Sequence, residues 1–164
     1  MAHNDVYVAL RYAAVMHQGH AAVVRHAGHE TFGRGAVMQE IQNGNLEMND
    51  TTKHLLDEMI TVSDNDAANT LTTYLGGGDS AAGMQAVNSF CQAHGYDQTH
   101  MGRMLLASNE NDDNYTSVGD CGHLLQEIYK QDTSGYTHAA DMFNLLKAQT
   151  RCNKIPAQLP VSYT

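Results

Sequence analysis

Side chains that could do chemistry gather in two stretches of this sequence. One is Ser63-Asp64-Asn65, where a hydroxyl, a carboxylate and an amide follow one another directly. The other lies nearer the N-terminus, where His17, His20, His26 and His29 form two pairs with three-residue spacing. A serine hydroxyl becomes a nucleophile when a base removes its proton, and neutral imidazoles on one helix face can share a metal ion. The sequence therefore raises two chemistries, serine catalysis and metal binding.

The stretch Ser63-Asp64-Asn65 is predicted to be a turn between two helices. Apolar residues at helical spacing precede it, and the pattern restarts over residues 65–75 with Ala68 and Leu71 on one face. Serine, aspartate and asparagine side chains accept hydrogen bonds from the unpaired N–H groups at a helix start. The tripeptide therefore suits the N-cap of the second helix.

The wider stretch Met59–Leu71, M-I-T-V-S-D-N-D-A-A-N-T-L, resembles the S-D-N element of class A β-lactamases and penicillin-binding proteins. The similarity extends to four other segments and covers about residues 35–159. These segments are Gly44-Asn45-Leu46, Leu75-Gly76-Gly77, Asn114-Tyr115-Thr116-Ser117 and Asn153-Lys154-Ile155-Pro156-Ala157.

The resemblance implies a role for each residue of the turn. Ser63 would relay a proton toward the leaving nitrogen of a β-lactam or peptidoglycan peptide. Asn65 would hydrogen-bond the amide side chain of the substrate, and Asp64 would brace the turn by accepting backbone N–H bonds. The resemblance implies no metal and no other cofactor.

Two further signatures of the family are absent. No serine is followed by lysine three residues later, as the nucleophile motif S-x-x-K requires, and the expected place reads H-A-G-H-E-T-F-G-R over residues 26–34. The K-T-G motif does not occur in the sequence. The omega loop of class A enzymes carries a general-base glutamate, and residues 101–114 offer only Glu110. Ser63 and Asn65 are therefore predicted to be vestigial, and Asp64 to be structural.

Composition narrows the class of protein. The chain has 164 residues, of which 42% are hydrophobic, so it can bury the core of one domain. Its net charge is −9 with only nine Lys plus Arg, which argues against nucleic acid or an anionic membrane as a partner. No run reaches transmembrane length. The N-terminal residues show no signal-peptide pattern, although the family that the chain resembles usually works outside the cytoplasm.

The three cysteines, Cys91, Cys121 and Cys152, cannot all pair within one chain. Cys91 and Cys121 fall within helical patterns and are predicted to be small buried side chains. A disulfide between Cys91 and Cys121 is the alternative.

The histidine-rich segment also has two interpretations. In the first, it is a polar, partly exposed helix or loop. In the second, His17, His20, His26 and His29 form a metal-binding or oligomerisation module that takes a transition metal such as zinc. No cysteine pair and no Glu-x-x-His pattern adds ligands, so the sequence favours the first interpretation and predicts no metal site.

The fold class predicted is mainly α. Six helices are expected, and the domain resembles the all-α lobe of class A β-lactamases with the sheet lobe largely absent. Residues 1–34 are expected to form an atypical His-rich segment, either helical or with short strands around Tyr7 and Val23. Residues 35–164 are expected to form the helical domain, with a solvated omega-type loop over residues 96–114.

These observations favour a β-lactamase-related helical domain without hydrolytic activity. A helical lobe without its sheet lobe leaves apolar surface that must be covered, so a homo-oligomer is expected. The alternatives are an active β-lactam or peptidoglycan-peptide hydrolase of the same family and the histidine module.

Overall fold

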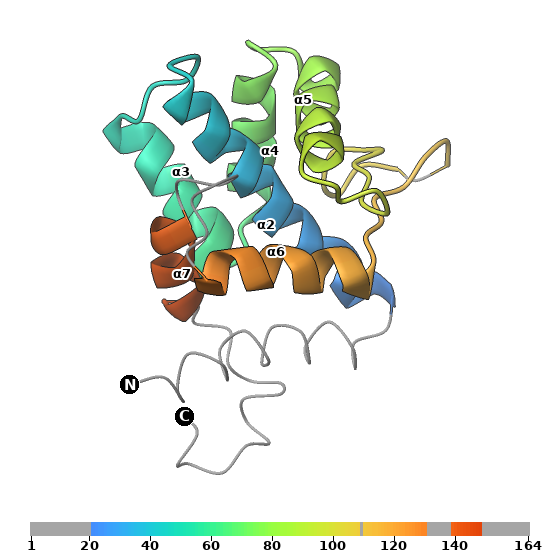
Figure 1. The fold of residues 1–164 in the computed structure, drawn as a ribbon. Helices are drawn as coiled ribbons and strands as arrows, with labels where there is room; N and C mark the ends of the chain where they lie inside the picture. The colour runs from blue at the N-terminus through green and yellow to red at the C-terminus, as the bar shows by residue number, and fades with distance from the viewer. Residues whose placement is uncertain (1–20, 109, 131–138, 149–164) are drawn as a thin grey trace.

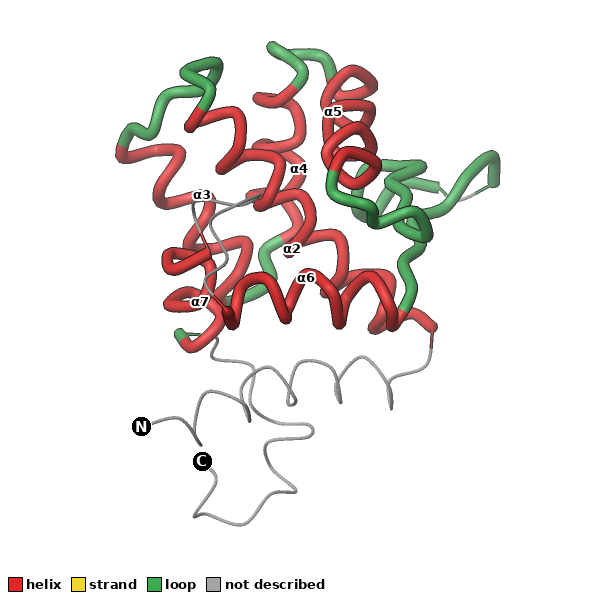
Figure 2. The backbone as a smooth tube through the Cα atoms, in the orientation of Figure 1, coloured by secondary structure: helices red, strands yellow, loops and turns green. Residues whose placement is uncertain are grey.

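The structure, a computed structural model, describes residues 21–108, 110–130 and 139–148. These residues contain six helices, which Figure 1 labels: α2 (Ala21–Gln42), α3 (Asp50–Thr61), α4 (Asn65–Leu75), α5 (Ser80–Ala93), α6 (Val118–Lys130) and α7 (Ala139–Lys147). The described part has no strand, as Figure 2 shows, and its β-pairing is one isolated bridge between His100 and Tyr115. The mainly α fold class is confirmed.

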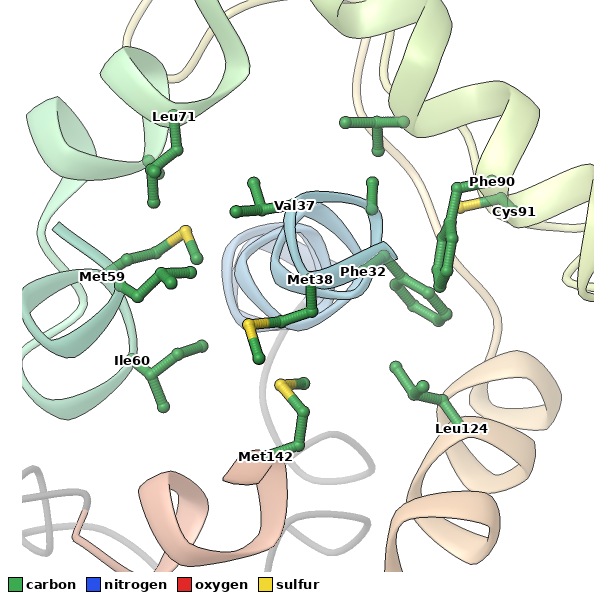
Figure 3. Packing of buried hydrophobic residues seen from close by; sticks show 14 of the residues in the cluster. Phe32, Val37, Met38, Met59, Ile60, Leu71, Phe90, Cys91, Leu124 and Met142 are labelled. Atoms are coloured by element: carbon green, nitrogen blue, oxygen red, sulfur yellow. The ribbon is translucent and has the colours of Figure 1, made fainter. Parts of the chain in front are cut away.

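Helix α2 lies at the centre of the described body. Figure 3 shows Val37 and Met38 on this helix with side chains from the other helices on several sides of it. Residues 34–38 are all buried, so this part of α2 has no solvent-facing stripe. The buried residues that surround it include Met59, Ile60, Leu71, Phe90, Leu124 and Met142.

Helix α2 begins earlier than the sequence indicated. The helical domain was expected to begin at residue 35, and short strands were an alternative around Val23, but a single helix runs from Ala21 to Gln42. The strand alternative is wrong at Val23, which lies within this helix. The boundary expected between residues 34 and 35 lies inside this helix, so the backbone marks no division there.

Short polar side chains set the starts of the next helices. Asn49 caps α3, and its Oδ1 accepts from Thr52 N at 2.9 Å. Asp79 caps α5 by accepting from two backbone N–H groups, and Ser117 Oγ accepts from Asp120 N at the start of α6. The expected cap of α7, Thr137, lies outside the described residues.

Two glycines allow neighbouring helices to approach closely. A Cβ at Gly83 of α5 would lie 1.8 Å from the backbone oxygen of Thr72 in α4. A Cβ at Gly35 of α2 would lie 2.6 Å from the ring of Phe90. The α4–α5 contact is therefore backbone against backbone, with no room for a larger residue.

None of the helices in the described ranges is long and apolar enough to cross a membrane.

Candidate functional site

The tripeptide Ser63-Asp64-Asn65 forms the turn between α3 and α4, as predicted. Two backbone N–H groups, those of Val62 and Asp64, donate to Glu58 O at 3.3 Å and close the end of α3. Asp64 then caps α4, and its Oδ1 accepts from Ala67 N at 2.7 Å. The turn thus places the three polar side chains at the N-terminal end of α4.

Ser63 adopts a left-handed backbone conformation with φ of 53°. Three other helix ends close through a residue with positive φ, and each of those residues is a glycine: Gly44, Gly77 and Gly95. At those ends the N–H of the residue after the glycine donates at 2.8–2.9 Å, against 3.3 Å for Asp64 N to Glu58 O. The backbone of Ser63 therefore has a left-handed conformation that glycine adopts without steric cost and that the β-carbon of serine makes unfavourable.

Replacing Ser63 by glycine is expected to stabilise the fold. Ser63→Gly should have a free energy of unfolding about 1 kcal/mol above that of Ser63→Ala, because alanine keeps the β-carbon and glycine removes it. Urea denaturation of the two variants measures the difference. Equal stability would mean that the backbone at Ser63 is not strained.

The side chains of Ser63 and Asn65 are partly buried. Within the residues that the structure describes, neither the Ser63 hydroxyl nor the Asn65 amide makes a hydrogen bond. Of the three side chains, Asp64 therefore caps the helix, while those of Ser63 and Asn65 make no hydrogen bond that holds the turn in the described part of the chain.

A small pocket lies beside α4, where four elements meet. It is lined by Gly33 and Val37 of α2, Met59 of α3, Ala68, Leu71 and Thr72 of α4, and Met101 and Leu105 of the following loop. The Thr72 hydroxyl, the one polar side-chain group among these residues, donates to Ala68 O at 2.9 Å. The pocket therefore has no group that could act as an acid or a base.

Three asparagines fasten the loop that joins α5 to α6. Asn69 donates to Leu105 O at 3.1 Å and accepts from Leu105 N at 2.9 Å. Asn88 holds Met101 in the same way, at 3.0 and 2.7 Å. Buried Asn114 accepts from the N–H groups of Gly102 and Arg103 at 3.0 and 2.9 Å. These bonds fix the backbone of residues 101–105 against α4 and α5.

Ion pairs add to this fastening. Arg103 Nε lies 2.8 Å from Asp113 Oδ1, and its Nη1 donates to Ala107 O at 3.1 Å. His100 Nε2 lies 2.8 Å from Asp112 Oδ2, and this hydrogen bond lowers the pKa of the Asp112 carboxyl. Glu110 is exposed on the same loop, and its N–H donates to Ser108 Oγ. The loop therefore presents no carboxylate to the apolar pocket.

The segment in which the nucleophile motif was expected lies within α2. Arg34 is buried there, with 2% of its surface exposed. His26 and His29 belong to α2, but the structure describes only their backbone. His17 and His20 lie outside the described residues. No cluster of three or more His, Cys, Asp or Glu side chains suited to a metal ion occurs in the described ranges.

Cys91 and Cys121 are buried free thiols. Burial raises the pKa of the Cys91 thiol to about 12 and also raises that of Cys121. Since a thiolate is needed for attack, neither can act as a nucleophile near neutral pH. The prediction of small buried side chains is therefore confirmed for both, the alternative of a disulfide between them is not formed, and Cys152 lies outside the described residues.

Comparison with known protein families decides the relationship. Residues 28–164 match the model of the beta-lactamase enzyme family. The chain belongs to the beta-lactamase enzyme family. The resemblance inferred from the S-D-N stretch is therefore confirmed, and the matched residues include the turn, the loop fastened by asparagines and the helices from Gly28 of α2 onward. The chain matches no curated protein and no solved structure.

The structure of this family member places the predicted site residues in one turn and leaves Glu110 on the solvent side of the loop. No role in holding the loop was predicted for Asn69, Asn88 or Asn114. Each bonds backbone groups 11 to 36 residues away in the chain, and such pairs leave no short-range spacing.

Proposed function

We propose that this member of the beta-lactamase enzyme family is a helical domain that does not hydrolyse β-lactams. The observation that carries the proposal is the apolar lining of the pocket beside α4. Acyl transfer to serine needs a nucleophile, a base and donors for the oxyanion. The residues that α2, α4 and the loop bring together there include Gly33, Ala68 and Leu105, and none can exchange a proton.

The loop geometry supports this proposal. Leu105 is the loop residue whose N–H and C=O are both held by α4, through Asn69. Its side chain is buried in the pocket, at 4% exposure, so an apolar group occupies the position nearest α4. The described loop residues that line the pocket, Met101 and Leu105, supply no base. Losing one catalytic member of such a unit costs on the order of 10⁶ in rate in one protease.

The alternative is an active hydrolase of the same family, with a β-lactam or a peptidoglycan peptide as substrate. One observation favours it. Ser63 keeps a strained left-handed backbone where glycine would serve the fold, and its hydroxyl makes no hydrogen bond in the described part of the chain. Strained residues of this kind cluster at active sites.

Self-association belongs to the main proposal. Val62, next to the turn, is 40% exposed, and this supports an apolar surface that another copy of the chain would cover.

Turnover of a chromogenic cephalosporin and covalent labelling by a fluorescent penicillin test the proposal directly. The full chain is expected to show no turnover above that of Ser63→Ala and no mass increase after incubation with penicillin. A penicillin adduct on the full chain that is lost in Ser63→Ala would establish the alternative, with Ser63 as nucleophile. An adduct that persists in Ser63→Ala would identify a different nucleophile and would equally overturn the proposal.

A further inference from the structure

A cluster of aromatic and ionisable side chains lies around Tyr96, away from the S-D-N turn. The Tyr96 side chain is almost fully buried, and its hydroxyl donates to Glu127 Oε2. His123 Nε2 lies 3.5 Å from the other oxygen of Glu127. His94 stacks on Tyr96, with 6.0 Å between ring centroids and 10° between ring planes. Two imidazoles and one carboxylate therefore surround a single buried phenol.

The cluster connects parts of the chain that are far apart in sequence. His94 is the C-cap of α5, while His123 and Glu127 lie on α6. The ring of His123 meets Tyr96 edge-on at 5.4 Å. On the other side, His94 Nε2 is 3.0 Å from Gln39 Oε1 of α2. In Figure 1, α6 runs crosswise below α2 and α5, so this cluster joins α6 to both of those helices.

We propose that His94, Tyr96, His123 and Glu127 form an acid-sensitive latch that holds α6 against α5 and loosens when the pH falls below the ordinary range of histidine titration. The proposal is independent of whether the chain hydrolyses β-lactams.

The groups that face His94 determine whether protonation of its ring is favourable in the folded chain. Its own helix contributes Phe90, whose ring centroid is 4.3 Å from that of the imidazole, and α2 contributes the uncharged Gln39. Helix α6 contributes one carboxylate, Glu127, and one imidazole, His123. Glu127 already accepts a hydrogen bond from the Tyr96 hydroxyl and lies near His123. A cation at His94 would therefore be buried between rings, and charge on His123 would oppose it.

The pH dependence follows from the pKa of His94. Burial lowers this pKa below its ordinary value of 6.5, and the charge of His123 lowers it as well, while the charge of Glu127 opposes both. The unfolded chain therefore binds a proton at His94 more tightly than the folded chain does. The stability contributed by neutral His94 is complete above pH 6.5 and is lost as the pH falls below that value.

Hydrogen exchange measured by mass spectrometry on the full chain tests where this loss occurs. Peptides from α6 are compared with peptides from α3 and α4 at pH 7.5 and 5.5, after correction for the chemical exchange rate. Exchange in α6 is expected to become on the order of tenfold faster at the lower pH, while α3 and α4 keep their protection. Parallel changes in α6 and in α3–α4 would overturn the proposal.

Two variants separate the latch from a general effect of histidine protonation. His94→Gln keeps a side chain that can hydrogen-bond and removes the charge, so its α6 exchange should vary with pH much less than that of the native chain. His54→Gln is the control, because His54, like His123 in the latch, lies 3.5 Å from a glutamate four residues later, but is exposed on α3. An unchanged pH response in His94→Gln would overturn the proposal. If His94→Gln does not fold, the comparison of α6 with α3 and α4 in the native chain decides the question.

Discussion

Replacing Gly83 by alanine is expected to lower the free energy of unfolding by about 3 kcal/mol. The added Cβ would lie 1.8 Å from the carbonyl oxygen of Thr72 and 2.7 Å from its carbonyl carbon. Both are backbone atoms inside α4, so no side-chain rotation relieves the overlap. The helices α4 and α5 would have to separate, which disturbs the buried contacts of Leu71 and Val87. Urea denaturation followed by circular dichroism measures the change.

Gly122→Ala is the matched control for this substitution. Gly122 lies in the interior of α6, and a Cβ there would meet no atom within 4 Å. The same chemical change should therefore raise the free energy of unfolding by about 0.8 kcal/mol, the difference in helix propensity between glycine and alanine. Equal effects at the two positions would contradict the close α4–α5 contact.

The second large effect is expected at Asn114. Asn114→Ala should lower the free energy of unfolding by about 3 kcal/mol. Its Oδ1 accepts from both Gly102 N and Arg103 N, and the side chain is buried, so alanine leaves two partly buried N–H groups unpaired at about 2 kcal/mol each. Alanine also removes the buried Asn114 Nδ2, which has no acceptor among the described residues, and this raises the free energy of unfolding by about 1 kcal/mol.

Thermal unfolding checks the Asn114 prediction, with an expected fall in Tm of roughly 6–12 °C. Asn111→Ala is the control, since Asn111 lies on the same loop and is exposed. Its Tm should stay within about 1 °C of the native value, because exposed positions of this kind have small effects. A similar Tm for the two variants would mean that Asn114 does not hold the loop.

The helices α3, α4 and α5 could be predicted from the sequence because their signals are local. Asp79 precedes α5 and accepts hydrogen bonds from its first N–H groups. Leu56 of α3 and Leu71 of α4 each belong to a run of apolar residues at helical spacing, on a face that is buried in the fold. Both kinds of signal depend on residues within a few positions of each other. The same is true of the S-D-N turn, in which Asp64 bonds a residue three positions later.

The continuous run of α2 from Ala21 to Gln42 could not be predicted, because the residues around Gly35 depend on tertiary contacts. Glycine weakens a helix on its own, and a helix covered on several sides shows no single apolar stripe. Gly35 is explained only by Phe90, whose ring lies where a β-carbon would be, and Phe90 is 55 residues away in the chain. In the candidate site, the position of the Leu105 side chain in the pocket could not be predicted either. It depends on the hydrogen bonds between Leu105 and Asn69, which lie far apart in the chain.

The central position of α2 has a consequence for biosynthesis. The ribosome releases this helix first among the six described, well before the residues of α5, α6 and α7 that cover it. During translation Val37 and Met38 must remain in contact with water or with a chaperone until those later segments emerge. Stalling the nascent chain before Ser80 should therefore expose a protease-sensitive apolar segment, which disappears once translation passes Lys147.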